Sequence, residues 1–171
     1  MKKQLFAALL SACVLFCILL CACAGGADSQ NTATLTGESG EFRYTLQSAE
    51  TEYEASSLRE DAPFDVTLTI EYTGDQDKID LWCVDDLGSI SMENKDGQAL
   101  LSDEFHSRDT TRITLKKGTP YEIRWTGADE YREYGGIPAG DYTIVAYLNF
   151  STDATYDSIQ ENTLDLSITV K

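Results

Sequence analysis

The sequence predicts an all-β fold, in which antiparallel strands form a sandwich of about 7–9 strands after a cleaved N-terminal signal peptide. Turn signals rich in Gly, Pro, Asn and Asp recur at intervals of about 8–12 residues. Between them, apolar residues occupy every second position, which is the pattern of a strand with one buried face. The clearest example is the alternating set Phe64, Val66, Leu68, Ile70 and Tyr72.

The first predicted strand covers residues 42–46, where aromatic and aliphatic residues alternate with polar ones. The second covers residues 64–72. Between them, residues 49–61 are polar and weakly periodic, and they form either a helix or an irregular excursion between the two strands. Seven further segments show strand features: residues 79–84, 89–93, 98–101, 112–116, 121–126, 141–150 and 164–170.

Several side chains have predicted structural roles within these strands. The Asp96-Gly97 pair indicates a tight turn between residues 89–93 and 98–101. Trp125 is expected to fill space between the two sheets, as large aromatic residues do in sandwiches. Tyr142 is expected to bury its ring while its hydroxyl bonds to the backbone near the turn that precedes its strand. Cys83 lies in an apolar run and is expected to be a small buried hydrophobic residue.

The N-terminus has the features of a secretory signal, namely a pair of lysines and an apolar run over residues 5–20. The run is shorter than the ~20 residues that a membrane-spanning helix needs. It ends in Leu20-Cys21-Ala22-Cys23, which resembles the lipobox of bacterial lipoproteins. The resemblance implies cleavage after Ala22, acylation of Cys23, and a protein held on the extracytoplasmic face of the cell membrane. An uncleaved signal anchor and cleavage without lipidation are the alternatives.

These observations divide the chain into three parts. Residues 1–22 are the lipoprotein signal peptide. Residues 23–40 are the lipidated cysteine and a flexible tether, because they are small, polar and rich in glycine. Residues 41–171 form one β-sandwich domain of ordinary size. The domain is expected to be monomeric.

Charge and cysteine content limit the classes of partner. The formal net charge is −16, and loss of the two leader lysines would make it −16 − 2 = −18. Such an acidic chain is not expected to bind nucleic acid or anionic lipid, both of which need a basic surface. Of the five cysteines, three precede the cleavage site, so an exported domain would retain no disulfide framework.

Two segments, TPYEIRW at residues 119–125 and YGGIPAGDYTIV at residues 134–145, carry a resemblance to a known family. They resemble the end of the bacterial Ig-like domains carried by lipoproteins of Gram-positive bacteria, and a related pattern occurs in the intracellular proteinase inhibitor family. The resemblance covers about residues 64–150. It implies an Ig-like sandwich that acts either as an interaction module or as a proteinase inhibitor through an end loop.

The segment at residues 127–136 is the candidate binding loop, because it carries Tyr131, Arg132 and Tyr134 between flanking glycines. Tyrosine and arginine are enriched at the energetic centres of interfaces. The partner would be an extracellular protein or a cell-wall ligand. The alternative is that the two tyrosines fold back and cover the edge of the sandwich.

A calcium site is a second hypothesis. Asp75, Asp77 and Asp80 provide alternating oxygen ligands, although the spacing of an EF-hand loop is not met. A solvated acidic loop is the competing interpretation. The single histidine, His106, lies near serines and aspartates but in no recognisable nucleophile–base motif. The sequence therefore predicts a protein that is not an enzyme and has no cofactor.

Overall fold

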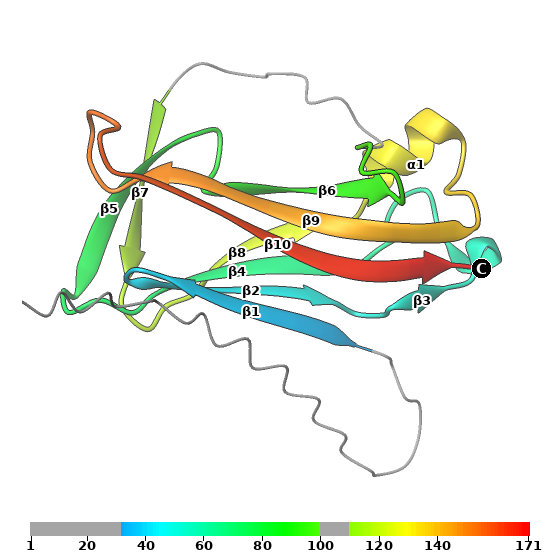
Figure 1. Ribbon diagram of the computed structural model, residues 1–171, viewed down its shortest axis with the longest axis horizontal. Helices are drawn as coiled ribbons and strands as arrows, with labels where there is room; N and C mark the ends of the chain where they lie inside the picture. Colours follow the sequence, from blue (N-terminus) through cyan, green and yellow to red (C-terminus); the bar gives the residue numbers. More distant parts are fainter. Residues whose placement is uncertain (1–31, 100–109) are drawn as a thin grey trace, which may run out of the picture.

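The computed structural model describes residues 32–99 and 110–171 (Figure 1). In this part of the chain, ten strands form two sheets that pack face to face, so the predicted all-β sandwich is confirmed. The strand number slightly exceeds the expected range because two short or irregular segments, described below, also pair as strands.

The first sheet has four antiparallel strands in the order β1-β2-β4-β8. Their inner faces are apolar and their outer faces are rich in threonine and charged residues, as the period-two pattern predicts. Their bounds are β1 (Ala33–Ser39), β2 (Phe42–Ser48), β4 (Val66–Tyr72) and β8 (Tyr121–Trp125).

The second sheet has six strands in the order β3-β10-β9-β5-β7, with β6 also paired to β9. All its pairs are antiparallel except the short parallel pair of β3 with β10. The bounds are β3 (Glu52–Tyr53), β5 (Lys78–Val84), β6 (Gly88–Asn94), β7 (Thr110–Lys116), β9 (Gly140–Ser151) and β10 (Ile159–Val170).

Strands β5 and β6 follow one another along the same side of β9, separated by a sharp break. Asp85 has a φ of 64°, a left-handed conformation that interrupts the strand. Asp86 then accepts hydrogen bonds from the Leu87 amide at 2.6 Å and the Tyr121 hydroxyl at 2.9 Å. Because Tyr121 begins β8, the break also joins the second sheet to the first.

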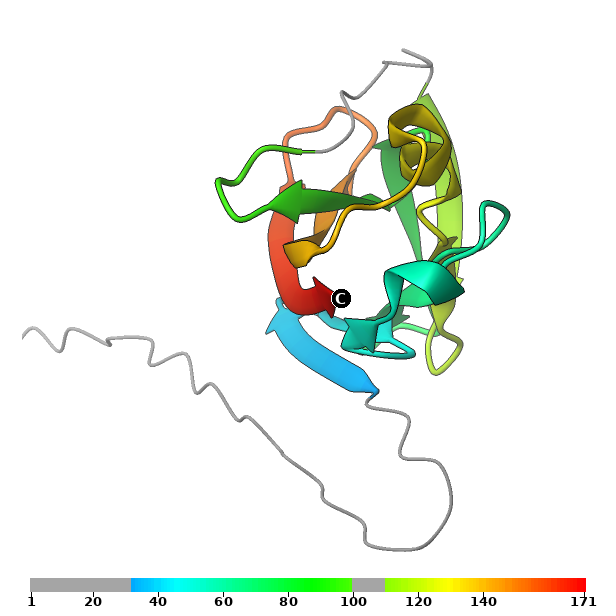
Figure 2. The same ribbon diagram turned by 90° about the vertical axis from the view of Figure 1, so that its right-hand side faces the viewer.

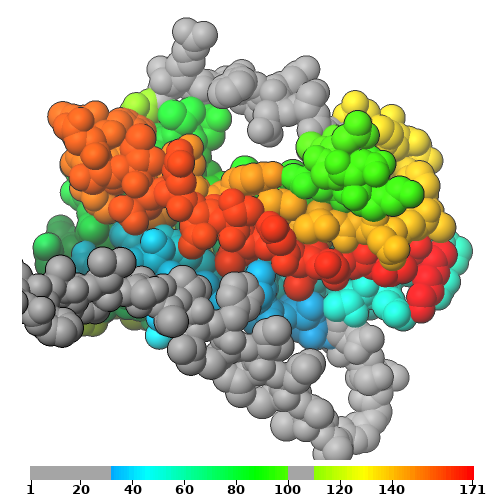
Figure 3. Space-filling view, viewed as in Figure 1, coloured from blue at the N-terminus to red at the C-terminus, as the bar shows by residue number. Residues whose placement is uncertain are grey.

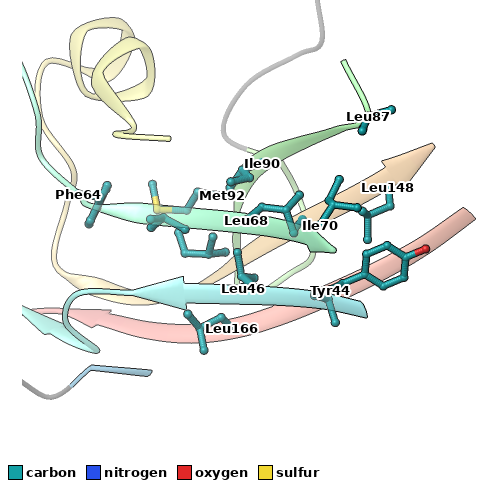
Figure 4. Packing of buried hydrophobic residues seen from close by; sticks show 14 of the residues in the cluster. Tyr44, Leu46, Phe64, Leu68, Ile70, Leu87, Ile90, Met92, Leu148 and Leu166 are labelled. Atoms are coloured by element: carbon teal, nitrogen blue, oxygen red, sulfur yellow. The ribbon is translucent and has the colours of Figure 1, made fainter. Parts of the chain in front are cut away.

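The core lies between the sheets and is built from the inward positions of both (Figure 4). Tyr44, Leu68 and Ile144 have no exposed surface. Cys83 is likewise fully buried, and burial raises the pKa of its thiol to about 11, which confirms that it serves as a hydrophobic residue. Burial of such alternating faces is the main stabilising contribution to a sandwich.

The prediction of a flexible tether through residue 40 is wrong for residues 33–39, which form β1. This strand pairs with β2 over its whole length and lies beside β10 (Figure 3). Its side chains are small where β1 and β10 approach each other, since a Cβ on Gly37 would lie 3.1 Å from Leu164 Cδ2. Only Leu35 is a large apolar residue, so the sequence pattern of this strand is weak.

The structure tests two other predicted segments, the excursion at residues 49–61 and the turn at Asp96-Gly97. Residues 49–61 form an excursion that contains β3 and a 3-10 turn, η1 (Ala55–Ser57), rather than a longer helix. The Asp96-Gly97 turn forms as expected, with Gly97 at a φ of 72° and its amide bonded to the Asn94 carbonyl. After it, Ala99 makes an isolated bridge to Glu93, and the remainder of the predicted strand lies outside the described residues.

The chain enters the sandwich at one particular end. Ala33, Ser48, Val66 and Trp125 are consecutive partners in one row across the first sheet. The same end holds the C-terminus, η1 and the helix described below (Figures 1 and 2). We call it the entry end.

Two buried tyrosines allow a direct test of hydrogen bonding in the core. The Tyr142 hydroxyl donates to the Pro138 carbonyl at 2.8 Å, as the sequence predicts. Within the described residues, the Tyr44 hydroxyl is buried and has no partner. Tyr142→Phe should therefore lower the free energy of unfolding by about 1 kcal/mol.

Tyr44→Phe is the matched comparison and should leave stability unchanged or raise it, because it removes a buried hydroxyl that bonds to nothing described. Urea unfolding of the two variants measures both effects. A larger loss of stability in Tyr44→Phe than in Tyr142→Phe would contradict this description of the core.

Candidate functional site

The expected binding loop contains a short helix, α1 (Ala128–Tyr134), so the prediction that this segment is a loop is wrong. Glycines bound the helix, with Gly127 and Gly135 at φ values of 66° and 68°. The Gly135 and Gly136 amides bond to carbonyls of the last turn, which is a glycine C-cap. Two acidic residues in the first turn favour the helix through its dipole.

The three predicted binding residues have different positions on α1. Tyr131 is half-buried and packs against the core. Tyr134 projects from the helix and is 49% exposed. Arg132 is exposed and pairs with Asp129 one turn earlier. The interpretation that the tyrosines cover the edge of the sandwich therefore applies to Tyr131, which folds back. The interpretation of an exposed binding residue applies to Tyr134, which does not.

Trp125 connects α1 to the end of the sandwich. Its ring stacks on Phe64, with ring centres 5.6 Å apart and planes within 4° of parallel. Phe64 in turn meets the edge of the Tyr53 ring at 4.9 Å. Trp125 thus closes the entry end beside the core and remains partly exposed, whereas the sequence predicted a position between the sheets.

Glu130 is the buried charged group of this site. It lies on α1, is only 2% exposed, and accepts a hydrogen bond from the Trp125 indole nitrogen at 3.1 Å. Burial raises the pKa of Glu130, and the neighbouring carboxylates of Asp129 and Glu133 raise it further. The bond from Trp125 opposes this shift in part. The pair fixes the indole ring against α1.

Two hollows flank Trp125. One, of about 410 Å³, lies between the η1 region and β8, and the other, of about 350 Å³, lies between β8 and α1. They share Arg124, Trp125 and Thr126, so they form one surface feature, which we call the Trp125 groove. Its other lining residues include Glu50, Tyr53, Ser57, Leu58, Phe64, Asp65, Asp129, Glu130 and Arg132.

The groove includes one predicted binding residue, Arg132, and two that the sequence interpretation missed, Arg124 and Trp125. Their position depends on the pairing of β8 with β4, which brings Trp125 opposite Val66 beside the segment that carries Phe64. The sequence did contain one local signal for the position of Trp125. Trp125 is the last residue of its predicted apolar alternation, and such a residue lies at an end of the sandwich.

The aspartates predicted to bind calcium do not converge. Asp80 accepts a hydrogen bond from the Thr114 hydroxyl at 2.5 Å and lies 3.9 Å from Arg112. Across residues 32–99 and 110–171, no three acidic, histidine or cysteine side chains gather as metal ligands would. His106 and its neighbours lie outside the described residues.

Comparison of the sequence with models of known protein families gives no match, and comparison with curated proteins gives none either. Among the helices of the described residues, none is long and apolar enough to cross a membrane. The interpretation of the groove therefore depends on its own chemistry.

The buried carboxyl group predicts a specific pH dependence. A raised native pKa means that Glu130 favours folding below the pKa of the unfolded chain, and that this contribution is lost as the pH rises through the native value. Between pH 4 and pH 7, the melting temperature of Glu130→Gln should therefore rise relative to that of the wild type.

Glu161→Gln, at an exposed position of β10, controls for the change in net charge. Thermal unfolding of the three proteins across this pH range provides the measurement. A wild-type advantage over Glu130→Gln that increases with pH would show that the assigned sign is wrong.

Proposed function

We propose that this protein is a lipid-anchored lipoprotein on the extracytoplasmic face of the cell membrane, with a non-catalytic Ig-like domain that binds another envelope component. The observation that carries the proposal is the motif Leu20-Cys21-Ala22-Cys23, which lies at the end of a short apolar run that two lysines precede. Two or more acyl chains give a stable anchor, because each buried methylene contributes about 0.8 kcal/mol.

The strand order supports the Ig-like class. An Ig-type sandwich places its first, second and fifth strands in one sheet and its third, sixth and seventh in the other. Here β2, β4 and β8 form one such set, while β10, β9 and the broken β5–β6 strand form the other. The strand in fourth place, β7, departs from the constant-type pattern, because it pairs with β5 in the second sheet instead of joining the first. Tyr142, bonded to the backbone at the preceding turn, is a further shared feature.

The geometry of the entry end relates the anchor to the groove. Only residues 24–32 separate Cys23 from β1, and nine residues span at most about 30 Å when fully extended. Ala33 and Trp125 belong to the same row of the first sheet. An anchor at Cys23 would therefore tether the domain at its entry end, which is the end that carries the Trp125 groove.

The side chains of the groove suit noncovalent binding. They provide an aromatic ring, two guanidinium groups and several carboxylates around one open surface. The alternative, a proteinase inhibitor acting through an end loop, gains no support from this site. The segment expected to act as its recognition loop is α1, with Tyr131 packed against the core.

The anchor is tested by substitution of the lipidated residue. Cys23→Ser should no longer incorporate labelled fatty acid, because no thioether can form. Cys21→Ser is the matched control and should still incorporate the label, since Leu20 before Cys21 is too large for the cleavage site. Labelling with radioactive palmitate followed by electrophoresis measures both.

The proposal fails if Cys23→Ser incorporates as much labelled fatty acid as the wild type. A wild-type chain that incorporates none and keeps the mass of the uncleaved chain would indicate a signal anchor instead.

A further inference from the structure

We propose that the Trp125 groove binds a neutral saccharide chain, with one sugar ring packed on the indole of Trp125. This inference rests on the proposed function, since it names the class of envelope component that the domain binds. It is carried by three features of the groove, namely a fixed aromatic platform, charge-paired arginines beside it, and its acidic surroundings.

The indole of Trp125 is fixed before any ligand arrives. Phe64 covers one face of the ring, and Glu130 holds the indole nitrogen at 3.1 Å. Trp125 is partly exposed and lines both hollows. A rigid aromatic surface costs little side-chain entropy on binding, and it offers the apolar face of a sugar ring a flat contact.

Two arginines line the groove beside this platform. Arg124 lies 3.6 Å from Glu122, and Arg132 pairs with Asp129, so both guanidinium groups are directed by carboxylates. Sugar hydroxyls donate and accept hydrogen bonds at once. Guanidinium donors and carboxylate acceptors that lie next to each other match this chemistry, and hydrogen bonds to charged groups are the stronger ones.

The lining of the hollow between β8 and α1 favours a saccharide over a peptide, whereas the hollow on the η1 side also has an apolar lining that includes Tyr53, Leu58 and Phe64. Protein interfaces are anchored by apolar or aromatic side chains that enter well-packed pockets. The hollow between β8 and α1 is instead lined by Arg124, Thr126, Asp129, Glu130 and Arg132, with Trp125 as its large apolar surface. A ligand rich in hydroxyl groups satisfies such a surface better than an apolar anchor does.

Charge favours a neutral saccharide. Glu50 and Asp65 line the hollow on the η1 side, and Asp129 lines the hollow on the α1 side. The whole chain carries a formal charge of −16. A polyanionic polymer would be repelled by this field. Because Trp125 lines both hollows, a saccharide chain that stacks on the indole has room for further sugar units in the adjoining hollows.

The experiment measures binding by the fluorescence of Trp125 in the full-length protein, purified in detergent. The chain has two tryptophans, so Trp82→Phe leaves Trp125 as the single reporter. The probes are neutral tetrasaccharides: chitotetraose, cellotetraose, maltotetraose and mannotetraose, each titrated to concentrations on the order of 10 mM to detect weak binding. We expect a saturable change in Trp125 fluorescence with at least one probe.

Two arginine variants in this background test the location of the site. Arg132→Ala should weaken binding roughly tenfold, the loss expected for one hydrogen bond to a charged group. Arg112→Ala is the matched control, because Arg112 is also exposed and lies beside an aspartate, but on β7. It should bind as the parent does.

Absence of a saturable change with all four probes would overturn the saccharide proposal, as would equal losses in Arg132→Ala and Arg112→Ala. If saccharides fail while an envelope protein is retained by the wild type and lost in Arg132→Ala, the ligand class is wrong but the interaction module stands. Failure of the anchor in Cys23→Ser is a separate outcome, which overturns the proposed function and leaves saccharide binding to be judged by the titration.

Discussion

Burial of alternating apolar faces between two sheets is the constraint on which the rest of this structure depends. The domain places Tyr44, Leu68 and Ile144 out of contact with water, and the single cysteine of the described residues, Cys83, is a buried thiol without a disulfide. Stability therefore comes from packing and from backbone pairing. Such a core is continuous along the strands and must be closed at both ends, where the alternation stops.

Closure of the entry end also produces the candidate site. Tyr53, Phe64 and Trp125 come from three segments and contact one another in series across that end, the first pair edge to face and the second pair stacked. Trp125 is the last ring of the series and is only partly covered, so α1 packs beside it and Glu130 bonds to its indole nitrogen. The groove is thus a consequence of how the sandwich is sealed. Its aromatic platform is rigid because the same contacts stabilise the fold.

The strands could be predicted from sequence wherever the alternation was strong, as in β4 and β9, because period two is a local property of the chain. β1 was missed since the residues at its inward positions are mostly small. Its place depends on pairing with β2 and on packing against β10. α1 was missed since it has only seven residues and is held by the contact between Trp125 and Glu130. The groove could not be predicted, because pairing of β8 with β4 is what assembles it. Arg132 was identified from residue type alone.

The proposed function depends most on the chemical state of Cys23, since an acyl chain there would tether the domain at its entry end. Mass spectrometry of the N-terminal peptide from the native protein tests this directly. The account predicts a mature chain that begins at Cys23 and carries a thioether-linked, acylated glyceryl group. A mature N-terminal peptide without lipid, or a chain that still includes residues 1–22, would contradict it.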